Sequence, residues 1–366
     1  MIRMLYCWGF SFLCFLLACS KPATNEGTVP DEMEMSPEAP LPPGWLVQPE
    51  EVIHGGPGVD GIRSIDYPRF IDADGVTFLA DDELVMGVKI GDAAHAYPQR
   101  ILDFHELVND VVGGEVITVT FAPLTGSALA WSRRIGEEET TFGSSGLLYH
   151  NNLMPYDRRT GSLWSQMRLD CVNGEQVGKQ LKTIPLVETT WKNWRKMFPK
   201  SQVLIVSNPE HFNYNGSRYR TYKTDPDYFL YPVGNYSKRL PSKERVLGVA
   251  VKGKAKALAF SFIARKPDQL WVFNEIINEE PVVFVGNAER NLLVAFSRRL
   301  SDGTVLTFQA LPDGNATILK DEAGNHWNVF GEAVRGPRQG EQLRSVHAHV
   351  GYWFAWSLFY KDLYLF

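Results

Sequence analysis

Cysteine is scarce in this chain of 366 residues, and three of its four cysteines lie within the first 19 positions. The rest of the chain therefore carries Cys171 alone. A single thiol excludes an internal disulfide, a Cys-x-x-Cys redox couple and a four-cysteine zinc site from this part of the protein. Cys171 itself is expected to be a small core residue rather than a reactive thiol.

Several motifs that signal catalysis are also absent. The sequence has no P-loop, no Gly-x-Ser-x-Gly elbow, no His-Glu-x-x-His helix and no paired Ser-His-Asp signature. Basic residues do not gather into the clusters that nucleic-acid binding requires. We therefore expect no nucleic-acid partner, no organic cofactor and no catalytic residues, while the presence of a metal stays open. These absences favour a binding protein over an enzyme.

The N-terminal apolar run is too short to span a bilayer. Arg3 is followed by uncharged residues from Met4 to Leu17, and Ala18 then precedes Cys19. A membrane-spanning helix needs about 20 apolar residues. A small residue before a cysteine at the end of such a run is typical of the signal peptides of bacterial lipoproteins. We predict a lipoprotein signal peptide over residues 1–18 and a lipid on Cys19, the mature N-terminus.

A lipid on Cys19 predicts a protein anchored in the bacterial cell envelope, with the membrane as its first partner. Ser20 stands where inner-membrane lipoproteins often carry Asp, which favours the outer membrane, facing the periplasm or the surface. Residues 19–50 are acidic, rich in proline and without apolar periodicity, so a disordered tether is expected there. Without Arg3 the chain has 36 basic and 42 acidic residues, a net charge of −6.

The body of the chain repeats itself, in order, at an offset of 161 to 169 residues. Ordered self-similarity of this kind indicates a duplicated unit of about 120 residues. The five recurring segments are Leu84–Val88 as Val246–Val249, His105–Asp110 as Asn274–Glu279, Trp131–Arg134 as Phe296–Arg299, Gly161–Trp164 as Gly324–Trp327, and Trp191–Trp194 as Trp353–Trp356.

Each unit is expected to be mainly β. Val116–Phe121 alternates and follows Gly113-Gly114, a hairpin signal, and Pro281–Val285 has the same character. Trp191 and Trp194 lie on one face of a predicted short helix and are expected to be core residues. The predicted fold is mainly β with short helices (α+β), with two pseudo-repeated units of about 120 residues packed together around a shared core.

The predicted boundaries place the first repeat unit at residues 51–206 and the second at 244–366. Residues 207–243 form a Tyr-rich connection between them. It is either a long ordered loop or the rim of a ligand site, because tyrosine offers a wide surface with a polar tip.

Long motifs make the body of the chain similar to a known bacterial family. It resembles the domain of unknown function 3179 family from about His54 to Phe366. The resemblance implies a shared fold and no established activity. The matching motifs are Gly55-Gly56-Pro57, Asp60-Gly61-Ile62, Ala96-Tyr97-Pro98, His105-Glu106, Asn109-Asp110, Ser145–Tyr149, Tyr156-Asp157-Arg158 and Trp353–Trp356.

The chain departs from the family pattern at one turn. Family members typically read Cys-Pro-Leu-Cys-Gly there, whereas this chain reads Ala122-Pro123-Leu124-Thr125-Gly126. In the family, two thiols near a histidine would suit a soft metal or a thiol–disulfide couple. Their loss implies that such chemistry is absent or much weakened here. The preceding hairpin is expected to bring Ala122 and Thr125 close to His105.

Polar residues of the first unit are the candidates for a surviving pocket. That unit has His105 and Asp110 where the repeat alignment places Asn274 and Glu279, which indicates a pocket in the first unit only. The alternative is that these groups serve turns and ion pairs of the scaffold. The candidate pocket comprises Arg100, His105, Glu106, Asn109, Asp110, Ala122, Thr125, Tyr149, Asp157, Arg158 and Ser162.

Two functional hypotheses follow. The first is a non-catalytic envelope lipoprotein that binds an unknown small molecule or an envelope protein, or serves in assembly, with a degenerate family site. The second is an envelope redox or metal-handling protein in which His105, helped by His347 and His349, coordinates a metal. His347 and His349 would share one face of a strand, which zinc or copper accepts, although no carboxylate or thiol lies nearby in the sequence.

Overall fold

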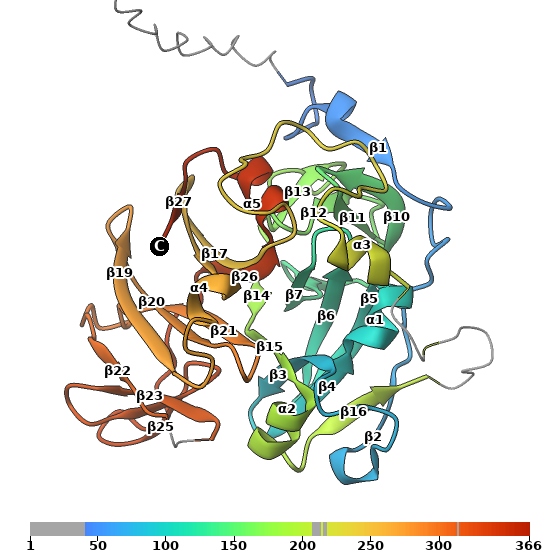
Figure 1. Cartoon of the computed structure of the whole chain (residues 1–366). Coiled ribbons are helices and arrows are strands. Elements are labelled where there is room, and N and C mark those ends of the chain that lie inside the picture. The colour runs from blue at the N-terminus through green and yellow to red at the C-terminus, as the bar shows by residue number, and fades with distance from the viewer. Residues whose placement is uncertain (1–40, 207–213, 215–217, 313–314) are drawn as a thin grey trace, which may run out of the picture. The chain divides into compact units, whose positions relative to one another are not determined.

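The N-terminal boundary of the folded body differs from the predicted one. The computed structural model describes residues 41–206, 214, 218–312 and 315–366 (Figure 1). The predicted signal peptide, Cys19, most of the tether and part of the Tyr-rich connection lie outside the described residues. The tether prediction is wrong at its end, because the Leu46 amide donates to the Val172 carbonyl at 2.9 Å and Val47 is buried. Removing these apolar side chains from water orders the segment.

The first half of the folded body is built on a five-stranded sheet in the order β15-β3-β4-β16-β2 (Figure 1). β16 runs parallel to β4, and the other neighbours are antiparallel. Helix α1 (Gln99–His105) follows β4, and α2 (Trp191–Met197) follows β15. The strands are β2 (Arg69–Asp72), β3 (Leu84–Ile90), β4 (Ala93–Pro98), β15 (Leu186–Thr190) and β16 (Gln202–Ile205).

The second half has a four-stranded sheet in the order β26-β17-β18-β27. Here β27 runs parallel to β18, and the other neighbours are antiparallel. Helix α4 (Phe260–Ile263) follows β18, and α5 (Trp353–Phe359) follows β26. The strands are β17 (Arg245–Val251), β18 (Lys254–Ala259), β26 (His347–Tyr352) and β27 (Leu363–Leu365).

Each half also contains a sheet made around one long hairpin. The orders are β14-β7-β6-β5 in the first half and β19-β20-β21 in the second. Pairing is antiparallel throughout. The strands are β5 (Leu107–Val112), β6 (Glu115–Ala122), β7 (Ser127–Ser132), β14 (Thr183–Ile184), β19 (Trp271–Ile277), β20 (Glu280–Asn287) and β21 (Leu292–Ser297).

A third antiparallel sheet completes each half, in the orders β1-β10-β11-β12-β13 and β22-β23-β24-β25. Its strands in the first half are β1 (Val52–His54), β10 (Phe142–Tyr149), β11 (Asn152–Asp157), β12 (Leu163–Ser165) and β13 (Asp170–Asn173). Those in the second are β22 (Phe308–Ala310), β23 (Thr317–Asp321), β24 (His326–Asn328) and β25 (Ala333–Arg335). The other described elements are η1 (Pro49–Glu51), η2 (Ala73–Gly75), β8 (Arg134–Ile135), β9 (Glu138–Glu139) and α3 (Arg220–Thr224).

Two glycines let helices α2 and α5 lie close against the central strands. A Cβ atom on Gly87 would lie 1.9 Å from the ring of Trp194, and one on Gly248 would lie 2.2 Å from the ring of Trp356. Any side chain at these positions would overlap the indole. The four tryptophans of the two helices are buried, which confirms their predicted role in the core.

Two asparagines, one in each half of the chain, make similar hydrogen bonds. Asn109 donates to the Phe142 carbonyl (2.9 Å) and accepts from the Phe142 amide (3.0 Å). Asn274 makes the same two bonds with Phe308, both at 2.9 Å. Asn274 thus makes the bonds that Asn109 makes, whereas His105, its predicted counterpart, contacts Arg63 and Tyr214 instead.

Two further pairs follow the same pattern. The Asp157 carboxylate accepts from the indole of Trp164 at 3.0 Å, and Asp321 accepts from the indole of Trp327 at 3.0 Å. Arg133 donates to the Thr140 carbonyl at 2.8 Å, as Arg298 does to that of Leu306 at 2.7 Å. Buried polar groups need partners of this kind, so each network fixes the strands around it.

A hydrophobic core cluster spans the two halves of the chain. One cluster joins Val85 and Trp194 of the first half to Val283 and Phe330 of the second. The Trp194 and Phe330 rings meet edge to face, with centroids 6.3 Å apart. Cys171 is a buried core residue, as expected, and burial raises the pKa of its thiol to about 12.

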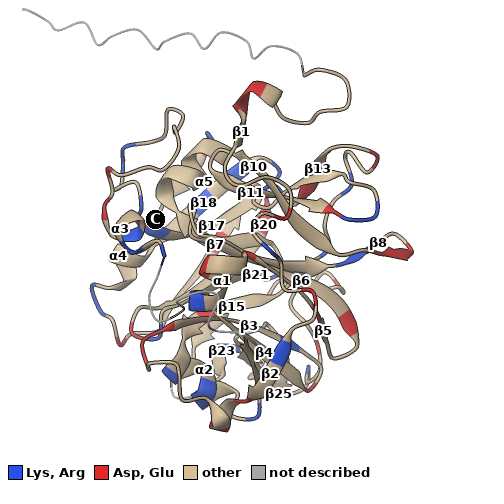
Figure 2. Cartoon of the chain, turned by 90° about the vertical axis from the view of Figure 1, so that its right-hand side faces the viewer, with Lys and Arg blue, Asp and Glu red and all other residues tan. Residues whose placement is uncertain are grey.

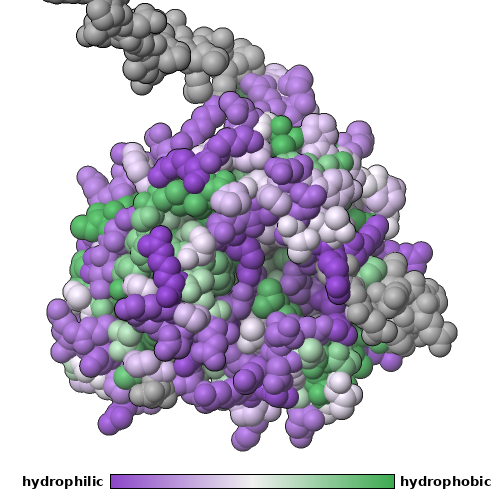
Figure 3. Space-filling view, viewed as in Figure 1, coloured by the Kyte–Doolittle hydropathy of each residue, from purple (hydrophilic) through white to green (hydrophobic). Residues whose placement is uncertain are grey.

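The prediction of a mainly β fold with short helices is confirmed. Within the described residues, none of the helices has the length and apolar character needed to cross a membrane. Lys, Arg, Asp and Glu are interspersed over the ribbon rather than segregated by sign (Figure 2). Hydrophobic side chains form separate patches in a mainly hydrophilic face (Figure 3).

Candidate functional site

A cavity of about 520 Å³ lies beside the turn that joins β6 to β7. Its wall combines the segment before β2, the turn, strands β10 and β11, and the Tyr-rich connection. Most lining groups are apolar or aromatic, with a few polar ones among them. The lining residues are Gly55, Gly56, Pro57, Ile62, Glu106, Ala122, Pro123, Leu124, Ser144, Gly146, Leu147, Leu148, Asn151, Leu153, Arg218, Tyr219, Thr221, Tyr222, Tyr228, Leu230 and Tyr231.

Glu106 is the acid of this cavity. It ends helix α1 with a φ of 57°, and its carbonyl accepts from the Phe121 amide at 2.8 Å. A residue with a side chain adopts this backbone conformation only at a cost, so the fold holds Glu106 in place. Burial raises the pKa of its carboxyl group to about 7, against the opposing effect of the Arg218 charge. Among the described residues, no group hydrogen-bonds this carboxyl.

Asn151 is the second polar group of interest. It lies in the turn between β10 and β11 with a φ of 62°, a conformation that asparagine tolerates better than most residues. Its Nδ2 donates to the Pro232 carbonyl at 3.2 Å, which identifies the other end of the amide as the oxygen. That Oδ1 atom is buried and has no hydrogen-bond partner among the described residues. A buried acceptor without a donor costs about 1–3 kcal/mol.

The described part of the Tyr-rich connection is ordered over the cavity. Lys243 holds it by donating to the carbonyls of Tyr222, Asp225 and Tyr228, and its Nζ lies 3.6 Å from the centre of the Tyr222 ring. The Tyr222 hydroxyl donates to the Leu124 carbonyl at 2.8 Å, which ties the connection to the β6–β7 turn. The described part of the connection is thus both an ordered loop and one wall of the cavity.

A family model described as "Protein of unknown function (DUF3179)" matches residues 59–363. The chain belongs to the DUF3179 family. This membership confirms the resemblance inferred from the sequence motifs. No curated protein and no solved structure matches the chain.

The DUF3179 turn in this chain has two different environments at its altered positions. Ala122 lines the cavity, whereas the Thr125 hydroxyl is buried beside Ser127 at 2.9 Å and accepts from Asn152 at 2.9 Å. Gln166 completes this buried network by accepting from Ser127 at 2.8 Å. Thr125 therefore makes hydrogen bonds of its own at the position where the resemblance leads us to expect a cysteine.

His105 lies at the end of α1 but contacts other groups than those predicted. Its Nδ1 is 2.9 Å from the Arg63 carbonyl and its Nε2 is 2.7 Å from the Tyr214 hydroxyl. Burial lowers the pKa of the imidazole. The hairpin does return beside this end of the helix, but the neighbouring Glu106, not His105, lines the cavity with Ala122. Proximity of the His105 ring to Ala122 and Thr125 stays a prediction.

The other predicted site residues make contacts that belong to the scaffold. Arg100 pairs with Glu83, and Tyr149 packs in an apolar cluster. Asn109 bridges β5 to β10, as described above. Asp110 accepts from the Tyr97 hydroxyl at 2.6 Å and pairs with His95 at 2.8 Å.

Asp157, Arg158 and Ser162 likewise stabilise turns and segments. Asp157 accepts from Thr160 and Trp164, and Ser162 accepts from the Gln176 amide. Arg158 bonds both Asp60 and Asp66 at 3.0 Å, and these bonds raise its pKa although burial acts to lower it. None of these three residues lines the cavity.

The histidines proposed for a metal do not converge. Within the described residues, no group of three or more His, Cys, Asp and Glu side chains is placed to hold a metal ion. His347 and His349 stack with centroids 5.6 Å apart, and burial lowers the pKa of both imidazoles, to about 4 for His347. Neither ring nitrogen of His349 has a hydrogen-bond partner among the described residues.

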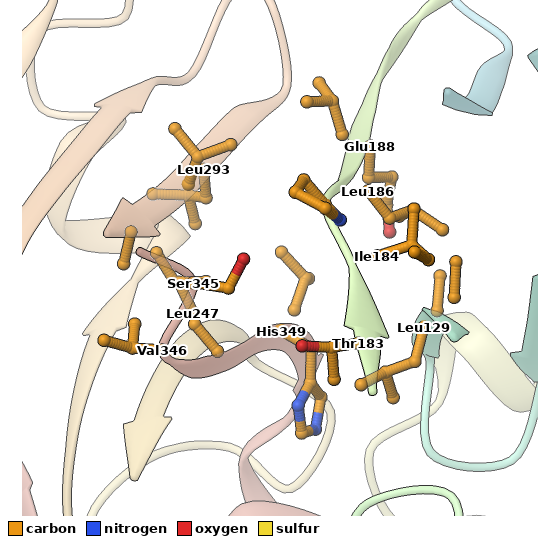
Figure 4. A pocket seen from close by; sticks show the side chains of 18 of the residues that line it. Leu129, Thr183, Ile184, Leu186, Glu188, Leu247, Leu293, Ser345, Val346 and His349 are labelled. Atoms are coloured by element: carbon orange, nitrogen blue, oxygen red, sulfur yellow. The ribbon is translucent and has the colours of Figure 1, made fainter. Parts of the chain in front are cut away.

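His349 lines a second, smaller cavity of about 70 Å³ (Figure 4). Leu129, Ile184 and Leu186 of the first half face Leu247 and Leu293 of the second across it. This volume accommodates a few water molecules and no organic ligand of ordinary size. The larger cavity is therefore the candidate functional site.

Sequence reasoning missed Asn151 and Arg218 and named Glu106 only as one of eleven residues. Two signals pointed to this region. The Gly55-Gly56-Pro57 motif and the tyrosines of residues 219–231 both contribute to the wall of the cavity. What the sequence lacked was a reason to bring these distant segments to the same turn.

Proposed function

We propose that this DUF3179 protein is a lipid-anchored protein of the bacterial cell envelope that binds a small organic molecule in the cavity beside the β6–β7 turn. The single observation that carries the binding role is the 520 Å³ cavity with a buried acid in its wall. Small-molecule sites are concave, mostly apolar and roughly 300–1,000 Å³ in volume, with a few placed polar groups. The wall described above has this composition.

An uncharged fluorescent probe tests the cavity directly. N-phenyl-1-naphthylamine should bind the mature protein with a rise in fluorescence, and Gly56→Trp should weaken that binding at least tenfold. Gly56 lines the cavity, and a Cβ there meets nothing within 4 Å, so the indole has room to enter. Gly75→Trp is the matched control, since a Cβ there also meets nothing and Gly75 lies outside the cavity wall. Equal affinity of the two variants would contradict the proposal.

Anchoring is tested at Cys19. The Met4–Leu17 run followed by Ala18-Cys19 supports a lipoprotein signal, and no other segment is apolar and long enough to hold the protein on a membrane. Cys19→Ala should move the protein from the membrane fraction to the soluble fraction. Sedimentation of Cys19→Ala with membranes after a high-salt wash would defeat the lipoprotein proposal.

We also propose that the two halves descend from one duplicated unit of about 120 residues. The matching strand orders β15-β3-β4-β16 and β26-β17-β18-β27 support this origin, as do the paired networks of Asn109 and Asn274. A rigid superposition of residues 82–200 on residues 244–362 should match most strands and both tryptophan helices. Different strand orders under that superposition would contradict duplication.

Metal handling is the second candidate function, and it is favoured by three ring nitrogens that have no hydrogen-bond partner among the described residues, Nε2 of His347 and both nitrogens of His349. Neutral imidazoles are good ligands for copper and zinc. Elemental analysis of the mature protein, purified without an affinity tag, distinguishes the candidates. Stoichiometric copper, zinc or iron would displace ligand binding as the preferred function, and a metal-free protein that binds the probe would support it.

A further inference from the structure

We propose that the cavity holds the protonated amine of a ligand with an apolar body. This inference rests on the proposed binding function and adds the chemical class of the ligand. Glu106 and Asn151 are the groups that would receive the amine, while the leucines and tyrosines of the wall would receive the body.

The two polar groups that would bind the amine are hydrogen-bond acceptors without donors. Both residues line the cavity. Burial and the charges of Arg218 and Asp103 act on the Glu106 carboxyl, with no hydrogen bond among the described residues, and the Asn151 Oδ1 atom is buried without a hydrogen-bond partner among them. A ligand that brings N–H groups would satisfy both. An ionised carboxylate in an apolar wall also favours a cation, because it has lost most of its hydration.

The charged side chains near Glu106 either bind other groups or form no ion pair with it. Asp103 pairs with Lys223 at 2.8 Å, and Lys243 is bound by three backbone carbonyls. Arg218 is exposed at the wall, with its guanidinium 5.8 Å from the centre of the Tyr219 ring. Arg218 influences the charge of Glu106 through space, and no ion pair joins the two side chains. The carboxylate is thus left for a ligand.

The remaining wall suits an apolar or aromatic body. Leu124, Leu147 and Leu148 supply aliphatic surface, and Tyr219 and Tyr231 supply aromatic surface. Aromatic faces also attract cations within about 6 Å of the ring centre. A carboxylate ligand would instead place its negative charge beside Glu106, and among the residues that line the cavity Arg218 alone would attract it.

Three probes that differ only in the head group test the inference. 3-Phenylpropylamine, 3-phenylpropan-1-ol and 3-phenylpropanoate should be titrated calorimetrically into the mature protein at pH 8. The amine should bind at least tenfold more tightly than the alcohol and the carboxylate. Glu106→Gln should weaken amine binding at least tenfold and leave alcohol binding within twofold. Glu115→Gln, an exposed residue outside the cavity wall, is the matched control and should leave both unchanged.

A second variant examines Asn151 without disturbing the backbone. Asn151→Gly keeps the positive φ accessible and removes the side chain. It also removes the bond to Pro232, so the ratio of amine to alcohol affinity is the readout. That ratio should fall about threefold or more.

The outcomes separate this inference from the proposed function. Carboxylate or alcohol binding as tight as that of the amine would overturn the ligand class, and so would amine binding unaffected by Glu106→Gln. Binding of N-phenyl-1-naphthylamine in either case would leave the proposed function standing. Failure of every probe, including that one, would remove both.

Discussion

Two hairpin turns, one in each half of the chain, are filled in different ways. In the second half, β20 ends at Asn287, whose side chain donates to the carbonyls of Asp268 and Gln269 and accepts from the Arg290 amide. In the first half, β6 ends at Ala122, which has no polar group and leaves the turn facing a cavity. The turn after β20 is therefore closed by the Asn287 side chain, whereas the turn after β6 faces the cavity.

This contrast teaches which features belong to the scaffold and which to the site. The asparagine, aspartate and arginine networks occur in both halves, so they are explained by the need to satisfy buried polar groups. Glu106, Asn151 and the described tyrosines of the connection surround the open turn of the first half alone. Predictions that break or sharpen the comparison can be ranked by the size of the expected effect.

The largest effect is expected at the paired glycines. Gly87→Ala and Gly248→Ala should each lower the free energy of unfolding by about 4 kcal/mol or more, because the new methyl group overlaps a buried indole. Urea unfolding checks this, with Gly75→Ala as a control that should change stability by less than about 0.5 kcal/mol. Tolerance of alanine at one glycine and not at the other would show that the two helices are not equivalent.

The paired asparagines should differ in the size of their effect. Asn109 is buried and also bonds Asp66 at 2.7 Å and Thr118 at 2.8 Å, whereas Asn274 is exposed. Asn109→Ala should cost about 3 kcal/mol and Asn274→Ala about 1 kcal/mol. Chemical denaturation of both variants measures the difference. Equal costs would mean that burial does not distinguish the two networks.

Glu106 should give the first half a pH dependence of its own. Its carboxyl has a pKa of about 7 in the folded protein and about 4.5 in the unfolded chain. The folded state therefore holds the proton more tightly, so this contribution to stability is full below pH 4.5 and is lost as the pH rises through 7. Glu106→Gln should remove the loss, making the variant about 3 kcal/mol more stable than the wild type at pH 8.

Unfolding measured at pH 5 and at pH 8 supplies the check for Glu106. The wild type should lose stability relative to Glu106→Gln between these two values. Parallel pH profiles would show that the carboxyl is better solvated than its position in the wall suggests.

The smallest effect on stability is expected from restoring the cysteines of the family pattern. Ala122→Cys with Thr125→Cys should cost about 1 kcal/mol, because Thr125 gives up bonds to Ser127 and Asn152. The Thr125 amide already donates to the Ala122 carbonyl at 3.2 Å, so the two positions lie within one tight turn. After mild oxidation, thiols counted in denaturant should show Cys171 alone in the mature double variant. Three free thiols would mean that the turn cannot close a disulfide.

Much of the scaffold could be predicted from the sequence. Alternating residues at Val116–Phe121 after a double glycine predicted the β5–β6 hairpin, and tryptophans spaced three apart predicted the buried helix faces. These signals are local, because each depends on the spacing of residues within one element.

The candidate site was less predictable because its parts come from distant segments. Polar residues such as Asp110 and Arg158 drew attention, yet Asp110 accepts from Tyr97 and Arg158 pairs with Asp60. The Glu106 carboxyl and the Asn151 Oδ1 atom are distinguished from these groups because they have no hydrogen-bond donor among the described residues. A sequence does not show whether a side chain has a partner. The repeat alignment paired His105 with Asn274, whereas the bonds to Phe142 and Phe308 relate Asn109 to Asn274.

The close approach of Gly87 to Trp194 also restricts the order in which these positions can change during evolution. A lineage cannot acquire a side chain at Gly87 while the indole remains, because the two would occupy the same space. The tryptophan must shrink first, which opens a cavity and lowers stability. The same constraint ties Gly248 to Trp356, so substitutions within each pair should be found together among descendants of this protein.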